Sequence, residues 1–412
     1  MVKFLYISFY FPPLGGAESR YNLSLIRRFL KRNFLPTIIT VTKDVNYLKD
    51  NSLEKLIPKD IKIIRCKWSY SFEKYIFKIR EILRIPANPL KVKGWKNFYK
   101  IAKRELKSDE YKFIYAVYGI GASLFAGVKL KKYKKIPLII EFRDPLVHNI
   151  INWKYMKTHS WRFWYLIQFK KAKKQLKFFL KYADLIVVES PIHKSMLINE
   201  YKIDKNKIVD YGMGYEEDYF KELKKNIISF LKKPVIGFVG HLYFGYEYVA
   251  KNFIFALKKL EEKGYSFTFI SIGDTSNIFS KYALEYNLEQ FIPINWISLK
   301  SALSLMQEMD FGLVVIEKEY KSNINSKIWE YLKLKLSILG IVPEDGAMGR
   351  IIKEGRCGYI LSYEKERMIT QLQNILENYK RNKILKPSDN FINKFSREKL
   401  IDKLIENIVN IL

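Results

Sequence analysis

The sequence predicts an α/β protein built from two doubly wound domains, each a mostly parallel sheet covered by helices. Its 412 residues are too many for one compact core. Short apolar runs of strand length alternate with amphipathic segments of helix length along the chain. A strand, a glycine turn and a helix open the chain, and the same succession starts again at residue 234. We therefore expect one domain over 1–215 and another over 216–395, with the charged stretch 216–233 as the linker.

The first predicted strand, 3–9, ends in a turn with two glycines, and a helix is expected from about Ala17. The backbone N–H groups of Gly15 and Gly16 could cradle a phosphate at the start of that helix. A plain tight turn is the alternative. The pattern G-x-G-x-x-G is absent from this turn, which argues against an ordinary dinucleotide-binding fold. Further strands are predicted at 37–41, 61–64, 113–117, 137–142 and 183–190.

The strand 137–142 ends in a cluster of charged residues, EFRDP. Doubly wound sheets place their sites at the carboxyl ends of strands, so Arg143 and Asp144 are candidate catalytic residues. His148 is a weaker candidate for a base. The alternative is that Arg143 and Asp144 only pair with neighbouring side chains.

The segment 151–182 carries nine Lys or Arg, no Asp or Glu, and ten aromatic residues. Basic and aromatic side chains interleaved on a helix are typical of a segment that lies on an anionic membrane. Stacking on single-stranded nucleic acid and a solvated basic helix are the alternatives. The side chains expected to contact the membrane are Trp153, Trp161, Trp164, Lys170, Lys171, Lys173 and Lys174.

Charge is divided unevenly between the two halves. Residues 1–215 contain 44 Lys or Arg against 17 Asp or Glu, whereas residues 216–412 contain 29 against 25. This asymmetry indicates a polyanionic neighbour for the first domain alone. The two cysteines cannot form a disulfide framework or a zinc site, and no D-x-D motif or signal peptide is recognisable. We expect a cytoplasmic protein without a metal.

The second half carries a further glycine turn, Gly240 and His241, after the predicted strand 234–239. Between the apolar runs 311–316 and 336–342 lies a helix on which Lys327 and Glu330 stand at i and i+3, so both heads can point to one place. An ammonium suits a diphosphate and a carboxylate can accept two ribose hydroxyls, although a surface ion pair is the alternative. The final stretch 396–412 reads as an amphipathic helix.

Four segments, FPPLGGAESRY, EFRDP, ADLIVVES and SKIWEYLKLK, occur in an order that resembles the GT-B glycosyltransferases, in particular the retaining enzymes of family 4. The resemblance covers nearly the whole chain. It implies two Rossmann-like domains that face a cleft: the first, with the helix 396–412 packed back on it, for the acceptor, and the second for the nucleotide sugar. It also implies a retaining, metal-independent hexosyltransferase that uses a UDP- or GDP-linked sugar and no other cofactor.

The resemblance assigns roles to individual residues. Gly240, His241, Lys327 and Glu330 would bind the donor, Lys327 and the Gly15–Gly16 turn meeting its diphosphate. Trp296 or Ile297 would flank the base, while Arg143 and Asp144 would face the sugar and the acceptor. Many family members carry E-x7-E, and here Ser322 stands where the first glutamate is expected.

The expected acceptor is a hydroxyl of a glycan or of a polyprenyl-linked saccharide, in the synthesis of a cell-surface polysaccharide or glycolipid. The expected location is the inner face of the cell membrane, as a peripheral protein. A GT-B nucleotide-sugar epimerase is one rival. A basic nucleic-acid-binding protein is another, although we expect no nucleic-acid partner.

Overall fold

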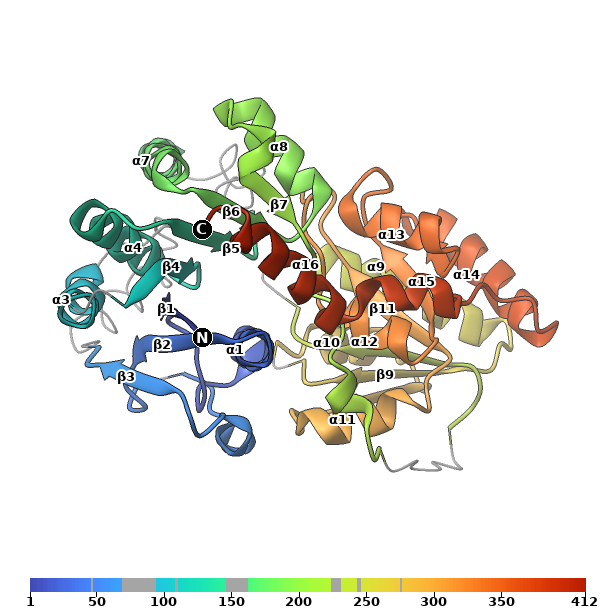
Figure 1. Cartoon of the computed structure of the whole chain (residues 1–412). Helices are drawn as coiled ribbons and strands as arrows, with labels where there is room; N and C mark the ends of the chain where they lie inside the picture. Colours follow the sequence, from blue (N-terminus) through green and yellow to red (C-terminus); the bar gives the residue numbers. More distant parts are fainter. Residues whose placement is uncertain are drawn as a thin grey trace. The chain divides into compact units, whose positions relative to one another are not determined.

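The computed structural model describes residues 1–45, 47–68, 94–107, 110–145, 162–223, 231–242, 246–274 and 276–412. The chain forms two compact units (Figure 1). One consists of Met1–Gly212 and Leu400–Leu412, and the other of Met213–Lys399. The first boundary thus falls after Gly212, where the sequence placed it at 215.

The first unit is built on a parallel sheet in the order β3-β2-β1-β4-β5-β6-β7. Its strands are β1 (Val2–Ile7), β2 (Phe34–Val41), β3 (Lys62–Cys66), β4 (Tyr111–Val117), β5 (Leu138–Phe142), β6 (Leu185–Val188) and β7 (Ile208–Asp210). The central strands are buried on both faces, which is why the sequence shows continuous apolar runs. Because β1 and β4 are neighbours, the winding of the chain reverses between them. Ligands of doubly wound sheets bind outside the carboxyl ends of strands at such a point.

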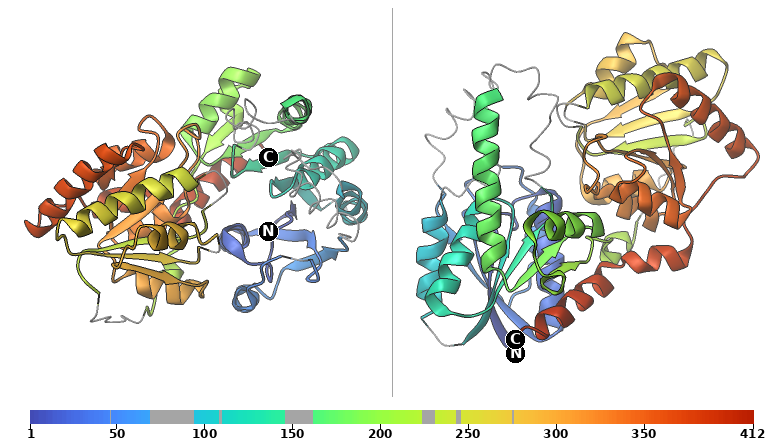
Figure 2. Two further views of the ribbon diagram at one scale, coloured as in Figure 1. Left: turned by 180° about the vertical axis from the view of Figure 1, so that it is seen from behind. Right: turned by 90° about the horizontal axis from the view of Figure 1, so that it is seen from above.

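Helices cover both faces of this sheet (Figure 2). One face carries α3 (Trp95–Glu105), α4 (Gly121–Lys134), α7 (Arg162–Tyr182) and α8 (Pro191–Tyr201). The other carries α1 (Gly16–Lys31), whose Phe29 ring packs on Phe4 of β1 with 4.9 Å between ring centroids. The last helix, α16 (Arg397–Val409), is tied to α1 because Asp402 forms ion pairs with Arg28 and Arg32.

The second unit has a parallel sheet in the order β10-β9-β8-β11-β12-β13. Its strands are β8 (Val235–Val239), β9 (Thr268–Ile272), β10 (Phe291–Ile294), β11 (Phe311–Val315), β12 (Ser337–Ile341) and β13 (Gly358–Ile360). One face packs on α9 (Glu247–Glu262), α10 (Ile278–Glu285) and α14 (Lys365–Lys380). The other packs on α11 (Leu299–Met306), α12 (Lys327–Lys333) and α13 (Ala347–Gly355). Here the winding reverses between β8 and β11.

Short elements complete the described chain. They are η1 (Asn51–Leu56), η2 (Lys205–Lys207), η3 (Glu217–Phe220), α15 (Asp389–Ile392) and η4 (Asn393–Phe395). Of the helices in the described ranges, none is both long enough and apolar enough to cross a membrane.

Two glycines of the second unit lie inside regular elements. Gly349 is within α13, where a Cβ would come 2.4 Å from the carbonyl oxygen of Pro343. Gly358 begins β13, where a Cβ would lie 2.0 Å from the carbonyl oxygen of Ile338. Close backbone approach, and not a turn, requires glycine at both positions.

Candidate functional site

The predicted pair of Lys327 and Glu330 stands on the first turn of α12. Lys327 Nζ lies 3.5 Å from Glu330 Oε1, and only 16% and 11% of the two side chains are exposed. The other carboxylate oxygen, Oε2, is buried and has no hydrogen-bond partner among the described residues. A buried acceptor without a donor is rare in native proteins and points to a missing ligand or water. The pair is therefore not the solvated surface ion pair that was the alternative.

Tyr331 fixes α12 against the middle of the sheet. Its ring covers Gly312 of β11, where a Cβ would approach to 2.5 Å. Its hydroxyl accepts a hydrogen bond from the Val239 N–H (3.0 Å) at the end of β8. The first turn of α12 is thereby held at the ends of β8 and β11, where the winding of the sheet reverses and ligands are expected.

The turn after β8 leaves open space. Gly240 has φ +132°, and a Cβ there would meet no atom within 4 Å. The neighbouring His241 side chain is 42% exposed, with Nδ1 3.8 Å from Asp274 Oδ1. Asp274 follows β9, and its buried Oδ2 lacks a partner among the described residues. Near two strand ends of this unit there is thus a buried carboxylate oxygen that has no hydrogen-bond partner within the described ranges.

The remaining predicted donor residues differ in exposure. Trp296 is 51% exposed beyond the end of β10, and Ile297 is partly buried. Ser322 is buried, as is Glu317 directly after β11, at 4% exposed. Burial raises the pKa of Tyr248, and the nearby Glu317 carboxylate, to which Tyr248 hydrogen-bonds, raises it further. Glu317 is thus the buried carboxylate of this loop, five positions before Ser322.

The double-glycine turn of the first unit is only partly available to a phosphate. The Gly15 N–H already donates to the Leu48 carbonyl (2.7 Å). A Cβ at Gly15 would lie 3.2 Å from the Leu48 side chain. The expectation that Gly15 offers its N–H to a ligand is therefore corrected. Gly16 begins α1 at φ +87°, which favours glycine there.

Arg143 has no donor left for a substrate. It is 4% exposed and makes five hydrogen bonds, two to Glu141, one to the Glu18 carbonyl, one to the Glu18 carboxylate and one to Asn22. A guanidinium has five N–H groups, so its capacity is used. The prediction that Arg143 faces the sugar is thus corrected to the alternative, pairing with neighbours. It is a positioning residue.

Four other ionisable groups gather at the same sheet edge. Burial raises the pKa of Glu18 to about 7, although Arg143 lowers it. Although the Asp144 side chain is exposed, loss of hydration around its carboxyl raises its pKa to about 6; Glu189 raises it further, whereas His193 and Arg143 lower it. Burial also lifts the pKa of Glu189 well above its usual range and lowers that of His193 to about 4. His193 Nδ1 lies 3.2 Å from Glu189 Oε2. Glu18 therefore titrates near neutral pH, whereas His193 is uncharged there.

Sequence reasoning missed Glu18, Glu189 and His193. Glu18 stands in the first turn of α1, and Glu189 directly after β6. The rule applied to Arg143 and Asp144, charged residues just beyond a strand, would have found Glu189. No group of three or more His, Cys, Asp or Glu side chains that could hold a metal ion exists within the described ranges.

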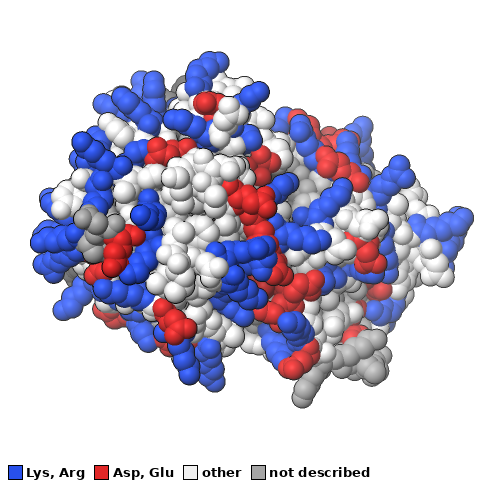
Figure 3. Space-filling view, viewed as in Figure 1, with Lys and Arg blue, Asp and Glu red and all other residues white. Residues whose placement is uncertain are grey.

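The structure describes some of the residues that are expected to contact a membrane. On α7, Lys170, Lys171 and Lys174 are exposed, while Lys173 pairs with Glu200. Exposed apolar side chains precede them: Phe163 is 72% exposed, and Leu166 and Ile167 are each 37% exposed. Trp153, Trp161 and His148 lie outside the described residues, and the Trp164 side chain is not described. On the face seen in Figure 3, Lys and Arg crowd the first unit, whereas acidic and basic side chains alternate over the second.

Comparison with solved structures places the chain in the GT-B fold class. Sucrose-phosphate synthase from Thermosynechococcus elongatus superposes with a TM-score of 0.70 at 13% identity, covering 100% of this chain and 99% of that one. Anabaena HepE in complex with UDP-glucose gives a TM-score of 0.67 at 12% identity over 100% of both chains.

An enzyme of another class has the same fold. UDP-GlcNAc 2-epimerase from Neisseria meningitidis, bound to UDP-GlcNAc, gives a TM-score of 0.60 at 12% identity, covering 99% of this chain and 100% of that one. No protein-family model and no curated protein sequence matches the chain. The predicted fold class, two Rossmann-like domains of GT-B type, is confirmed.

Proposed function

We propose that the protein is a retaining, metal-independent glycosyltransferase that moves a hexosyl group from a UDP- or GDP-linked sugar to a hydroxyl of a glycan or polyprenyl-linked acceptor. The observation that carries the proposal is the Lys327–Glu330 pair, largely buried at the switch point of the second sheet with one carboxylate oxygen unsatisfied. Two fold neighbours, HepE and the Neisseria epimerase, have nucleotide sugars bound in their structures. That supports a nucleotide sugar as the ligand of this edge.

In this reaction a bond forms between the acceptor oxygen and C1 of the sugar, and the bond from C1 to the diphosphate breaks. Negative charge develops on the leaving diphosphate, and groups that stabilise it there lower the barrier. The Lys327 ammonium and the N–H groups around Gly240 are assigned that role. The free oxygen of Glu330 would accept a hydrogen bond from a ribose hydroxyl, and Trp296 or Ile297 would flank the base.

Asp144 is assigned to take the proton from the acceptor hydroxyl. Its pKa of about 6 leaves it ionised at neutral pH and close enough to neutrality to accept a proton efficiently. Arg143 holds Glu18 and Glu141 in place beside it and does not contact the substrate.

A thermal-shift panel of nucleotide sugars tests the proposal. A donor at 100 times its Kd stabilises the folded state by about 2.7 kcal/mol, which corresponds to a rise in Tm of about 5 °C or more. Glu330→Ala should abolish most of that rise, because a hydrogen bond to a charged acceptor contributes about 1.5–3 kcal/mol. Glu354→Ala, at an exposed glutamate of α13, should behave as the wild type. If no nucleotide or nucleotide sugar raises the Tm of the wild type, the proposal fails.

A GT-B nucleotide-sugar epimerase is the second candidate, because an enzyme of that class is among the fold neighbours. An epimerase converts the donor without an acceptor. Incubation with the stabilising donor alone separates the two: a new sugar configuration on the intact nucleotide supports the epimerase, whereas a donor that stays unchanged until acceptor is added supports the transferase.

We further propose that the first unit docks on the anionic inner face of the cell membrane, for cell-surface polysaccharide or glycolipid synthesis. The exposed Phe163, Leu166 and Ile167 precede the exposed lysines 170, 171 and 174 on α7. Such a helix combines apolar insertion with about 1 kcal/mol per cation near an anionic surface. Flotation with anionic vesicles should recover the wild type, and Phe163→Ser with Lys170→Ala and Lys171→Ala should reduce recovery. Equal recovery with neutral vesicles would refute the electrostatic part.

A further inference from the structure

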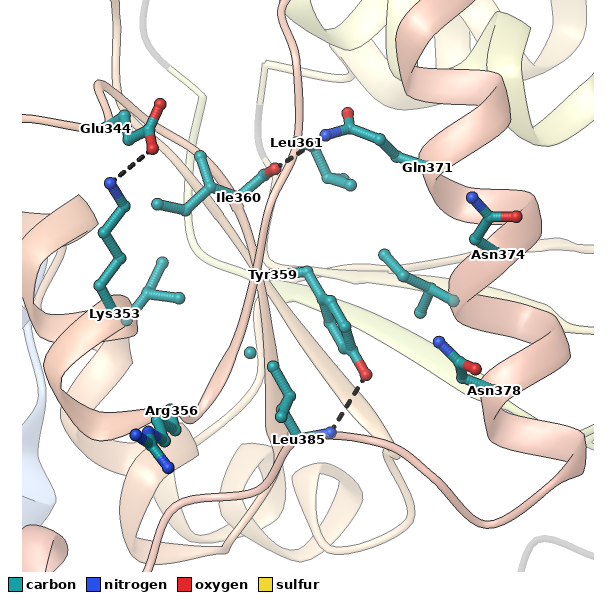
Figure 4. A pocket seen from close by; sticks show the side chains of 13 residues that line it. Glu344, Lys353, Arg356, Tyr359, Ile360, Leu361, Gln371, Asn374, Asn378 and Leu385 are labelled. Carbon is teal, nitrogen blue, oxygen red and sulfur yellow. Dashed lines mark hydrogen bonds and ion pairs between the residues drawn. The ribbon is translucent and has the colours of Figure 1, made fainter.

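A cavity lies within the second unit, away from the Lys327–Glu330 pair. It has a volume of about 630 Å³ and opens between α13 and α14, along β13 (Figure 4). Because β13 is the edge strand of this sheet, the cavity lies three strand spacings from β8, each spacing being about 4.8 Å. Volumes of about 300–1,000 Å³ are typical of small-molecule sites.

The floor of this cavity is apolar and includes one aromatic ring. Ile352, Leu361 and Ile375 line it together with the ring of Tyr359. The ring is held in place because the Tyr359 hydroxyl accepts a hydrogen bond from the Leu385 N–H (3.1 Å). The C–H faces of a sugar ring can pack on such a surface.

Two carboxamides of α14 line the cavity. Asn374, which is exposed, and Asn378, which is partly buried, are one helical turn apart (Figure 4). Within the described residues, neither side chain has a hydrogen bond. Each carboxamide offers both donors and an acceptor, the complement of hydroxyl groups, which also donate and accept.

Arg356 brings one positive charge to the rim. No carboxylate pairs with it in the described part of the chain, whereas Lys353, nearby, pairs with Glu344 at 2.5 Å. Arg356 is the αL residue that ends α13, with φ +42°. Arginine is well suited to bind a carboxylate or a phosphate.

The groove is closed to an added peptide strand. The Cys357 carbonyl accepts a hydrogen bond from the Ile338 N–H, and the Leu361 N–H donates to the Gly340 carbonyl, both toward β12. Because backbone groups of successive residues point to alternate sides of a strand, those of Ile360 face the groove. Gln371 occupies that edge: its Nε2 donates to the Ile360 carbonyl (3.1 Å) and its Oε1 accepts from the Ser362 N–H (2.7 Å). The Gln371 amide therefore occupies the backbone positions to which an added peptide strand would have to hydrogen-bond.

We propose that this cavity is a binding site for a sugar that carries an anionic group, a carboxylate or a phosphate. Asn374 and Asn378 bind its hydroxyls, Tyr359 supports its apolar face, and Arg356 binds the anion. The site is separate from the donor site and does not depend on the transfer reaction proposed above.

Calorimetric titration of the full chain with glucuronate, glucose 6-phosphate, glucose and inorganic phosphate tests the proposal. At least one of the two charged sugars should bind about tenfold more tightly than glucose and than phosphate, with a Kd in the millimolar range or below. Arg356→Gly should weaken that binding about tenfold or more. Asn374→Ala with Asn378→Ala should weaken binding of the charged sugar too, because its hydroxyl contacts are lost.

The chain supplies a matched control. Lys202 also ends a helix, α8, in the αL conformation with φ +54°, and it is exposed. Lys202→Gly removes one cation from the same backbone geometry without touching the cavity, and should leave the affinity unchanged. Glu330→Ala should also bind the sugar normally, which separates this site from the donor site. If Arg356→Gly binds as the wild type does, or if the charged sugars bind no tighter than phosphate, the proposal is overturned.

Discussion

The charged side chains at the two sheet edges differ in how their hydrogen-bonding capacity is used. At the edge of the first unit, Arg143 uses all its donors on Glu141, Glu18 and Asn22 inside the protein. At the edge of the second unit, Glu330 and Asp274 each keep one buried oxygen without a partner among the described residues, and Glu189 does so at the first edge. A closed network keeps a group where it is, whereas an unsatisfied oxygen gains by accepting a ligand. The arginine of the first edge is therefore not available to a ligand, whereas buried carboxylate oxygens at both edges can accept a hydrogen bond.

The first edge also carries carboxyls with raised proton affinity. Glu18 and Asp144 have pKa values near 7 and 6. Perturbed carboxyls in one place are typical of acid–base sites. Under the proposed function, proton transfer belongs to the first unit and nucleotide binding to the second, and four experiments test this assignment.

The largest expected effect is on turnover. Asp144→Asn should lower kcat by about 10²–10⁴-fold, because it removes the assigned base, and should leave the donor-induced thermal shift intact. For the wild type, kcat/KM should rise with pH through about 6 as Asp144 loses its proton. Asp210→Asn is the control, since Asp210 ends β7 and pairs with Lys194 at 3.3 Å. Normal turnover of the Asp144→Asn variant would show that Asp144 is not the base of the reaction.

The next effect is on stability. Arg143→Met should destabilise the first unit by about 3–5 kcal/mol, because Glu141 and Glu18 lose the charge that compensates them. Hydrogen exchange in α1 and β5 should rise accordingly. Arg350→Met, at an exposed arginine of the second unit, should change little. Unchanged exchange at α1 would show that the network does not hold this edge together.

The pH dependence of stability follows from Glu18, 26% exposed. Its folded pKa of about 7 exceeds its ordinary value of 4.5. The folded state therefore binds the Glu18 proton more tightly than the unfolded state does. The resulting contribution to the free energy of unfolding is fully present below about pH 4.5 and is lost as the pH rises through about 7. The loss is up to about 3 kcal/mol before solvent screening. Urea unfolding across this range should show a shallower fall for Glu18→Gln than for the wild type. Glu110→Gln, at an exposed site, should keep the wild-type slope.

A smaller change in stability is expected where α16, the last helix, packs on α1. Although burial opposes it, hydrogen bonds from Arg32 and Arg28 lower the pKa of Asp402 to about 2. Asp402→Asn should cost about 1 kcal/mol, since the pairs are partly exposed, and should raise hydrogen exchange in α16 and α1 together. The wild type should lose this contribution only as the pH falls from about 4 toward 2. Faster exchange in the second unit instead would contradict the placement of α16.

The fold could be predicted because buried parallel strands leave apolar runs that stand out in the sequence. The helix with Lys327 and Glu330 was found for the same reason, since it lies between two such runs. The strands β7 and β13 were missed because they have only three residues each. Three residues give no periodicity to recognise.

The site was less predictable, since it depends on contacts between distant residues. Arg143 looked catalytic because strand-end arginines often are, and nothing local shows that Asn22 and Glu18 occupy its donors. Likewise Gly15 looked open, although Leu48, far along the chain, takes its N–H. Asn374 and Asn378 read as ordinary surface residues of α14, and only the fold brings them opposite β13.

The second unit is an insertion within the first. The chain leaves the first unit at Gly212 and rejoins it at Leu400, so both termini of the protein belong to one unit. The two ends of the insert are fastened to each other: the Arg397 guanidinium donates to the carbonyls of Met213 (2.9 Å) and Gly214 (2.8 Å), and Tyr215 forms a bridge with Ser396. A continuous fragment of residues 213–399 would therefore retain the contacts that join its two ends. Removing the last 13 residues, 400–412, would instead damage the unit that contains the N-terminus.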